Sequence, residues 1–150
     1  MERILVIDDD EAILQNTSRA LKIEGYEVDL ADTGQKAIEL AERNLYNLAL
    51  IDIRLPDMEG TELLTALKNT TPRMIRIILT GFPTVSNAIT AVNKDADGYL
   101  TKPVKMDELI KTIKEHLIKQ SKEEKFDEEK VTEFVESRLR KLETEKGTHT

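Results

Sequence analysis

The chain has 150 residues, of which 39% are hydrophobic and 34% charged, with a formal net charge of −7. This length suits one ordinary domain with an appendage, and the acidic balance disfavours nonspecific nucleic-acid binding, which needs basic surface to displace counterions. The absence of cysteine excludes disulfides and thiolate metal sites. No apolar run approaches membrane-spanning length, and Met1 leads directly into an apolar segment, so we expect a cytoplasmic protein without membrane contact.

Short apolar segments alternate with helical patterns through the first 118 residues. The predicted strands cover 3–7, 26–31, 48–51, 75–79 and 98–100, and the predicted helices cover 12–24, 34–41, 61–67, 83–92 and 104–117. Gly25 is expected to end the first helix and Thr33 to cap the second. This alternation predicts an α/β fold whose parallel sheet has helices on both faces. The third and fourth strands are apolar throughout, which is typical of a sheet's centre.

The composition changes at about Lys119, and more than half of residues 119–150 are charged. Apolar residues nevertheless recur at steps of three and four along this segment, which predicts an amphipathic helix with a narrow apolar stripe. The stripe would pack on the domain, on a second copy or on a partner; a solvated, frayed helix is an equally good explanation. Residues 147–150 are expected to be disordered. We therefore predict a domain over 1–118 and a helical extension over 119–150.

Polar residues follow four of the predicted strands at the point where each strand ends. These residues are Asp8 and Asp9, Asp52, Thr80 and Lys102. Because the carboxyl ends of parallel strands meet at one edge of a sheet, we expect them to lie together. Three converging carboxylates repel one another, and Mg²⁺ is the hard cation that oxygen ligands favour. With a lysine and a hydroxyl nearby, the set suits phosphoryl transfer to an aspartate nucleophile.

Each of these residues alone has an ordinary structural explanation. Asp8–Asp10 could cap the first helix, since acidic residues favour helix N-termini. Asp52 could form a turn, Thr80 could be a cap, and Lys102 could be a surface lysine. The combination, with each residue type at the end of the correct strand, favours the functional interpretation.

With these motifs, residues 1–118 closely resemble the response-regulator receiver domain (CheY-like) of two-component signalling. The matching segments are Ile7-Asp8-Asp9-Asp10-Glu11, Leu50 to Gly60, Leu79-Thr80-Gly81, Tyr99 and Lys102-Pro103. The resemblance implies a flavodoxin-like, doubly wound (βα)5 fold with strand order 2-1-3-4-5, followed here by the helical extension. It also implies a phosphorelay function and a Mg²⁺ or Mn²⁺ cofactor.

The same resemblance assigns roles to individual residues. It implies that Asp52 is the phosphoacceptor, that Lys102, before a cis bond to Pro103, stabilises the phosphoryl group, and that Thr80 and Tyr99 are switch residues. The implied metal ligands are Asp8, Asp9, Asp52 and the backbone carbonyl of Arg54.

Three residues are expected to flank the phosphate. Gly81 replaces the more usual alanine beside Thr80, and it is small enough to leave room for a phosphate. Phe82 is bulky and Arg54 is long and cationic. Our hypothesis is that Arg54 and Phe82 restrict the attacking water and slow dephosphorylation.

A HAD-like phosphatase is the competing interpretation. Asp8 would then be the nucleophile and Asp10 the acid/base. Against this, Ala12 stands where that pattern expects Thr or Val, the chain lacks the length for a cap domain, and Asp52 has no role. We therefore expect a signalling protein that catalyses only its own phosphotransfer and slow autodephosphorylation.

The expected partners follow from the resemblance. A histidine kinase or phosphotransfer protein would supply the phosphoryl group. A downstream protein or a second copy would bind the face formed by segments 83–92, 98–100 and 104–117, or the extension over 119–150. No direct nucleic-acid contact is expected.

Overall fold

The computed structural model describes residues 1–81, 84, 89–91, 93 and 96–148. They form two compact units, Met1–Lys114 and Glu115–Thr150. The strands are β1 (Arg3–Ile7), β2 (Glu27–Ala31), β3 (Leu48–Ile51), β4 (Ile75–Thr80) and β5 (Gly98–Thr101). The helices are α1 (Glu11–Ile23), α2 (Gly34–Arg43), α3 (Gly60–Thr70) and α5 (Met106–Thr148), which continues into the second unit. Most of the helix predicted over 83–92 lies outside the described residues.

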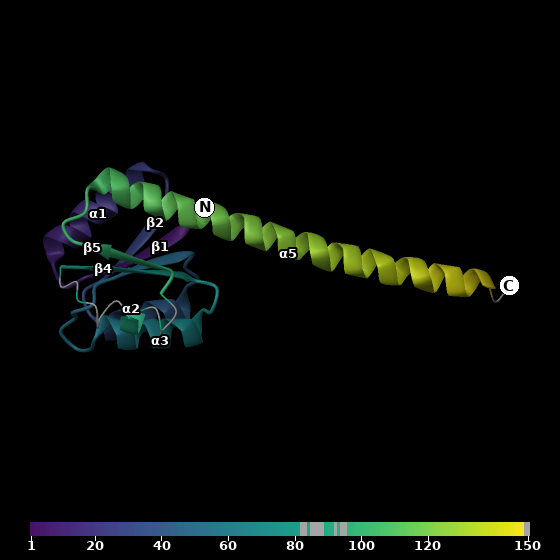
Figure 1. The fold of residues 1–150 in the computed structure, drawn as a ribbon, viewed down its shortest axis with the longest axis horizontal. Helices are drawn as coiled ribbons and strands as arrows, with labels where there is room; N and C mark the ends of the chain where they lie inside the picture. Colours follow the sequence, from purple (N-terminus) through teal and green to yellow (C-terminus); the bar gives the residue numbers. More distant parts are fainter. Residues whose placement is uncertain (82–83, 85–88, 92, 94–95, 149–150) are drawn as a thin grey trace. The chain divides into compact units, whose positions relative to one another are not determined.

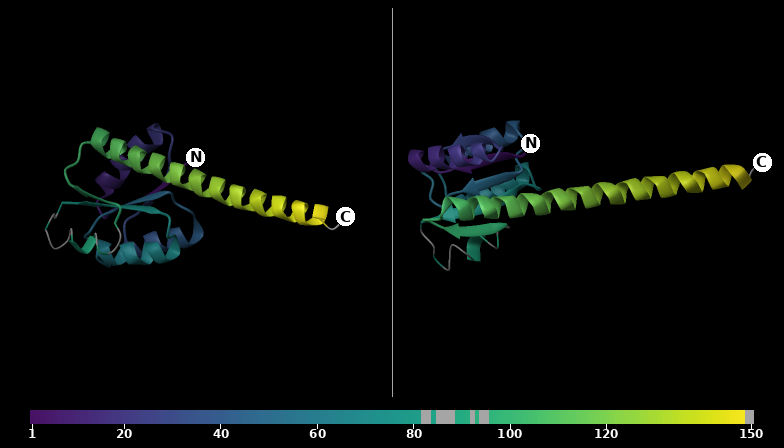
Figure 2. Two further views of the ribbon diagram at one scale, coloured as in Figure 1. Left: turned by 45° about the vertical axis from the view of Figure 1, so that its right-hand side comes forward. Right: turned by 90° about the horizontal axis from the view of Figure 1, so that it is seen from above.

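The five strands of the first unit form one parallel sheet in the order β2-β1-β3-β4-β5. Helices α2 and α3 cover one face of this sheet, and α1 with the first turns of α5 covers the other (Figure 1). The views in Figure 2 show the same two layers of helices. The predicted flavodoxin-like fold and its strand order are therefore confirmed.

The central strands β3 and β4 are buried along their whole length. Successive strand side chains point to opposite faces, so both faces of the sheet contribute to the core. On one face, Ile7, Ile51 and Ile78 belong to a buried cluster that includes Leu63 and Leu67 of α3. Each fully buried side chain of this size contributes about 1.5–3 kcal/mol. The rigid centre of the sheet holds the loops that follow β1, β3 and β4.

Two short-range signals are confirmed at the helix ends. Thr33 caps α2, since its hydroxyl accepts a hydrogen bond from the backbone N–H of Lys36 at 3.1 Å. Gly25 follows α1 with φ = 94°, a left-handed conformation that glycine adopts without steric cost. The chain therefore turns into β2 where the sequence predicts.

The second unit is a continuous helical segment, the part of α5 from Glu115 to Thr148. The predicted C-terminal helix is confirmed and runs to Thr148, and disorder at the end of the chain stays a prediction. A single glycine costs a helix only about 1 kcal/mol, so Gly147 does not by itself end it. No helix within the described part of the chain is long and apolar enough to cross a membrane.

Candidate functional site

The register of the sheet places Asp8 beside Asp52. Ile7 of β1 pairs with Ile51 of β3, so the aspartates that follow these two residues leave the sheet side by side. The backbone N–H of Asp52 donates to the Ile7 carbonyl at 3.0 Å, and that of Asp8 donates to the Ala31 carbonyl at 3.1 Å. The ladder thus extends one residue beyond the strands and fixes both backbones.

Lys102 follows β5, which lies at one end of the strand order, and its side chain reaches the same carboxyl edge of the sheet. Thr80 pairs with Thr101, and the N–H of Lys102 donates to the Thr80 carbonyl at 2.7 Å. The Lys102-Pro103 peptide is cis, as the resemblance implies. The ammonium of Lys102 donates to Asp8 Oδ2 at 2.6 Å and lies 3.4 Å from Asp52 Oδ2. One cation therefore bridges two carboxylates.

Asp8 and Asp52 are largely removed from water, whereas Asp9 is exposed and Lys102 is partly buried. Asp8 is 3% exposed, Asp52 7% and Thr80 0%. Burial raises the pKa of Asp52 above its ordinary value, and the charge of Asp8 adds to this, although Lys102 opposes it. Burial would lower the pKa of Lys102, but its hydrogen bond to Asp8 and the charges of both aspartates raise it. The Lys102 ammonium therefore lies beside the Asp52 carboxylate, whose ionisation burial disfavours.

Three carboxylates at this edge form a candidate metal centre. Asp8, Asp9 and Asp52 each offer an oxygen, and the three atoms lie within 4.8 Å of one another. Against Lys102, the three negative charges leave an excess of two, which matches a divalent cation. Oxygen-only donors suit Mg²⁺ or Mn²⁺. The residues present therefore fit the implied cofactor.

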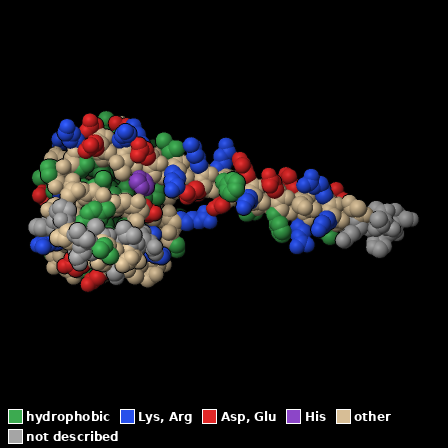
Figure 3. Space-filling model, in the orientation of Figure 1, with side chains coloured by type: hydrophobic (Ala, Val, Ile, Leu, Met, Phe, Trp, Pro, Cys, Tyr) green, Lys and Arg blue, Asp and Glu red, His purple; other side chains and the backbone are tan. Residues whose placement is uncertain are grey.

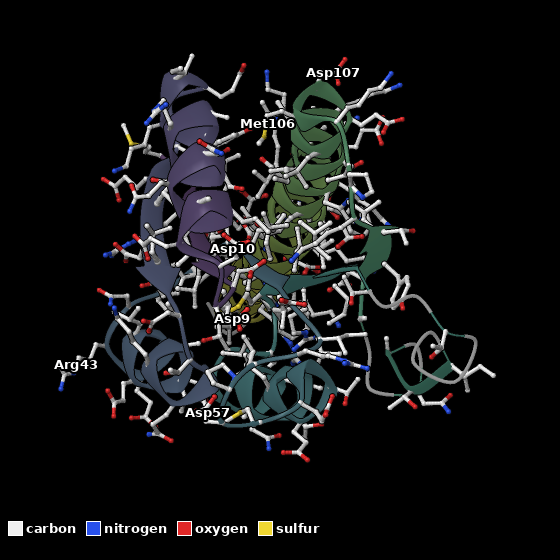
Figure 4. All side chains as sticks on the ribbon, turned by 90° about the vertical axis from the view of Figure 1, so that its left-hand side faces the viewer. Asp9, Asp10, Arg43, Asp57, Met106 and Asp107 are labelled. Carbon is white, nitrogen blue, oxygen red and sulfur yellow. The ribbon has the colours of Figure 1, made fainter. Side chains whose placement is uncertain are left out.

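Asp10 has a different place from its two neighbours. Its carboxylate accepts hydrogen bonds from the N–H groups of Ala12 and Ile13 at 2.9 and 3.2 Å, which caps α1. Asp9 and Asp10 lie where β1 passes into α1 (Figure 4). The capping explanation is therefore correct for Asp10.

Thr80 and Tyr99 lie on neighbouring strands at different depths. Thr80 ends β4 and is completely buried. Tyr99 pairs with Ile78 and packs against the core cluster. Among the described residues, its buried hydroxyl has no hydrogen-bond partner. A buried hydroxyl without any partner costs about 1–3 kcal/mol, and no described residue supplies a hydrogen bond to Tyr99.

The loop after β3 is held by contacts that the sequence analysis missed. Asp57 accepts hydrogen bonds from the N–H groups of Gly34 and Gln35 at 2.8 and 2.9 Å, and these bonds lower its pKa. Figure 4 shows Asp57 beside the layer of helices formed by α2 and α3. The partners lie 22–23 residues away in sequence, so no local pattern points to them. We call these two hydrogen bonds the Asp57 clamp. They hold in place the loop that contains the backbone carbonyl of Arg54.

Gly60 closes the same loop against the phosphoacceptor candidate. Its N–H donates to the Ile53 carbonyl at 2.6 Å. A Cβ at this position would collide with the carbonyl oxygen of Asp52 and lie 2.7 Å from the Cα of Ile53. Only glycine allows this approach.

We predict that Gly60→Ala lowers the free energy of unfolding by about 1–3 kcal/mol, since backbone must move to admit the methyl group. Chemical denaturation at equilibrium measures the loss. Gly81→Ala is the matched control, because among the described residues a Cβ there meets the Cβ of Lys102 at an ordinary 3.9 Å. Equal effects of the two substitutions would contradict the steric argument.

The remaining flanking residues are placed only in part. Gly81 is exposed directly after β4, and its place beside a phosphate stays a prediction. Arg54 is exposed and lines an open hollow with Glu59, Thr61 and Thr90. Phe82 lies outside the described residues.

Comparison with known proteins adds independent findings. Residues 4–114 match the family model of the response regulator receiver domain. A CheY-like receiver domain protein from Methanospirillum hungatei JF-1 is 46% identical with a TM-score of 0.81, over 82% of this chain and 98% of that chain. A Burkholderia pseudomallei response regulator with a phosphorylated aspartic acid, calcium ion and citrate is 28% identical with a TM-score of 0.73, over 83% and 73%.

Curated sequences give the same result over a shorter part of their length. Response regulator MprA of Mycobacterium sp. (strain KMS) is 33% identical over 122 residues, which are 81% of this chain and 53% of MprA. The chain therefore spans about half the length of the curated relatives that it matches.

Proposed function

Because the chain belongs to the response-regulator receiver family of two-component signalling, we propose that Asp52 accepts a phosphoryl group from a histidine kinase or phosphotransfer protein. The observation that carries this proposal is the single edge that brings Asp52, Asp8 and the Lys102 ammonium within hydrogen-bonding reach. Response regulators are signalling proteins, so the reaction is a step in signal transfer.

In the proposed reaction, a carboxylate oxygen of Asp52 forms a bond to phosphorus. The bond from phosphorus to the donor's nitrogen or oxygen breaks, and its electron pair leaves with the donor. Lys102 stabilises the negative charge that spreads over the phosphoryl oxygens. The hydrogen bond from the Lys102 ammonium to Asp8 at 2.6 Å holds the ammonium close to the Asp52 carboxylate, which would receive the phosphoryl group.

We propose that Asp8, Asp9, Asp52 and the backbone carbonyl of Arg54 hold Mg²⁺ or Mn²⁺. When bound, the cation neutralises charge on the transferring phosphoryl group. The donor set supports this assignment, and the Asp57 clamp would keep the loop of Arg54 in place.

The switch is proposed to involve Thr80 and Tyr99. The Thr80 hydroxyl would donate to the new phosphate, and Tyr99 would change position beside it. Because the Tyr99 hydroxyl is buried without a partner among the described residues, rotation toward water would regain its hydrogen bonds and lose apolar packing. Two positions of similar free energy are what a phosphate-driven population shift requires.

A phosphatase centred on Asp8 and Asp10 is not favoured. Asp10 caps α1 and its carboxylate is committed to two backbone N–H groups. The phosphatase interpretation also leaves the Asp52 and Lys102 contact without a role.

Labelling with a small phosphodonor tests the proposal. Acetyl phosphate with Mg²⁺ should add one phosphoryl group per chain, measured by intact-mass spectrometry, and a chelator should prevent it. The phosphatase would instead turn over a generic phosphate ester without stoichiometric labelling. No labelling under any divalent cation would overturn the proposal.

We predict that Arg54→Ala and Phe82→Ala each shorten the lifetime of the phosphorylated protein by several-fold. Arg54 is exposed two residues after Asp52, where its side chain would hinder the attacking water. Decay of the phosphoprotein after donor removal gives the lifetime. Lys68→Ala, an exposed cation on α3, is the control, and unchanged lifetimes in both variants would refute the prediction.

The extent of the functional unit is part of the proposal. We propose a receiver over 1–118 and an extension over 119–150 that contributes to output. Downstream output through a protein target or a second copy is proposed for this chain; direct nucleic-acid contact is not. Because the chain matches only about half the length of its curated relatives, this applies to these 150 residues alone.

A further inference from the structure

The second unit exposes an apolar stripe on a charged helix. Val131, Phe134, Val135, Leu139 and Leu142 of α5 are between 48% and 63% exposed. Figure 3 shows apolar side chains among acidic and basic ones along this helix. In proteins, most of a helix's stability comes from packing its apolar face, so we expect another apolar surface to pack on this stripe.

The spacing of the stripe is that of a two-stranded helical seam. Steps of four and three residues alternate along one line of the helix, through Glu124, Glu128, Val131, Val135, Arg138 and Leu142. This is the spacing of the a and d positions of a coiled coil, with apolar residues at three of the six positions and charged residues at the other three. Valines occupy its centre, two glutamates its N-terminal half and an arginine its C-terminal half. The charge on the seam is therefore polarised along the helix.

We propose that this segment of α5 pairs antiparallel with the same segment of a second copy of the chain. In this register Val131 faces Val135 of the second copy, and Glu128 faces Arg138 of the second copy. Both contacts occur twice because the pair is two-fold symmetric. Phe134 lies next to the two-fold axis, where it meets its own copy.

The charge pattern selects this orientation over the parallel one. A parallel pair in register would place Glu124, Glu128 and Arg138 each against its own copy, and like charges at a seam repel. In the antiparallel pair, Glu128 of each helix instead faces Arg138 of the other helix. The proposal does not depend on Asp52 chemistry, so it can fail while the proposed function stands.

Sedimentation of the full chain without phosphodonor tests the pairing. The mass should rise with concentration from one chain toward two. Glu128→Arg and Arg138→Glu should each raise the dimer dissociation constant about tenfold, because two attractive contacts become repulsive. The double variant should restore pairing. Glu133→Arg, on the opposite side of the helix, is the matched control and should change little.

Cross-linking tests the orientation, using the absence of native cysteine. Positions 124 and 142 of one helix are about 27 Å apart at 1.5 Å per residue, and a disulfide needs Cα atoms within about 7 Å. Leu142→Cys alone should give no disulfide dimer, whereas an equimolar mixture with Glu124→Cys should give the mixed one. A Leu142→Cys homodimer would show a parallel pair and overturn the proposal. A monomer at all concentrations would also overturn it, and would leave the stripe to the receiver or to another protein.

Discussion

Asp52→Asn should abolish phosphoryl incorporation from acetyl phosphate while leaving the fold intact. The amide cannot act as the nucleophile, and no other described carboxylate contacts Lys102 except Asp8, which is already bonded to it at 2.6 Å. Intact-mass spectrometry checks the loss. Asp107→Asn, an exposed aspartate at the start of α5, is the matched control and should label like the unchanged protein. Full labelling of Asp52→Asn would refute the phosphoacceptor assignment.

The same variant should be more stable than the unchanged protein at neutral pH when divalent cations are absent. Because burial and Asp8 raise the folded-state pKa of Asp52, the folded protein holds its proton more tightly than the unfolded chain. Stability therefore falls as pH rises from the ordinary aspartate value of about 4 through the raised pKa. Asp52→Asn has no carboxyl group at this position, so its stability does not fall for this reason as pH rises.

Thermal unfolding with chelator at several pH values measures the difference. The two proteins should converge in acid, where Asp52 is neutral in both states, and diverge toward pH 7. Mg²⁺ should narrow the gap, because a ligand of the folded state stabilises it by mass action. Parallel pH profiles for the two proteins would show that folding does not raise the pKa of Asp52.

The sheet and the central site could be predicted because both depend on short-range signals. Apolar runs locate the strands, and parallel strands bring their carboxyl ends to one edge whatever the loops do. The pairing of Ile7 with Ile51 then places Asp8 next to Asp52 without further information. This is why three carboxylates, Thr80 and Lys102 could be assigned to one site from the sequence.

Other features depend on contacts that no local pattern encodes. The Asp57 clamp on α2 joins residues more than twenty positions apart. The contacts of Lys102 with Asp8 at 2.6 Å and with Asp52 at 3.4 Å join residues 94 and 50 positions apart. The capping of α1 was predictable as a possibility, but only the structure separates Asp10 from Asp8 and Asp9.

The C-terminal helix illustrates a different limit. The sequence predicts two helical segments with a compositional break near Lys119, whereas α5 is continuous from Met106 to Thr148. No proline or glycine stands between Pro103 and Gly147, so nothing interrupts the backbone hydrogen bonds where the composition changes. A change in composition indicates that the side chains have different surroundings, but it does not by itself end a helix.

Lys102→Met should separate metal binding from phosphoryl transfer. Methionine keeps much of the side-chain volume and removes the charge, so transfer from acetyl phosphate should slow by about 10²-fold. Mg²⁺ should bind at least as tightly as before, because Asp8 and Asp52 lose the cation that competes for their oxygens. Labelling time courses give the rate, and Mg²⁺ titration followed by calorimetry gives the affinity.

Stability supplies the third readout for this variant. Without Lys102, the buried Asp8 and Asp52 lose the cation that contacts both of them, so the melting temperature in chelator should fall. Mg²⁺ should restore most of it by neutralising the same carboxylates. Lys105→Met, an exposed lysine three residues further on, is the matched control and should change none of the three measurements. An unaltered transfer rate together with weaker Mg²⁺ binding would reverse the proposed role and make Lys102 a support for the metal ligands.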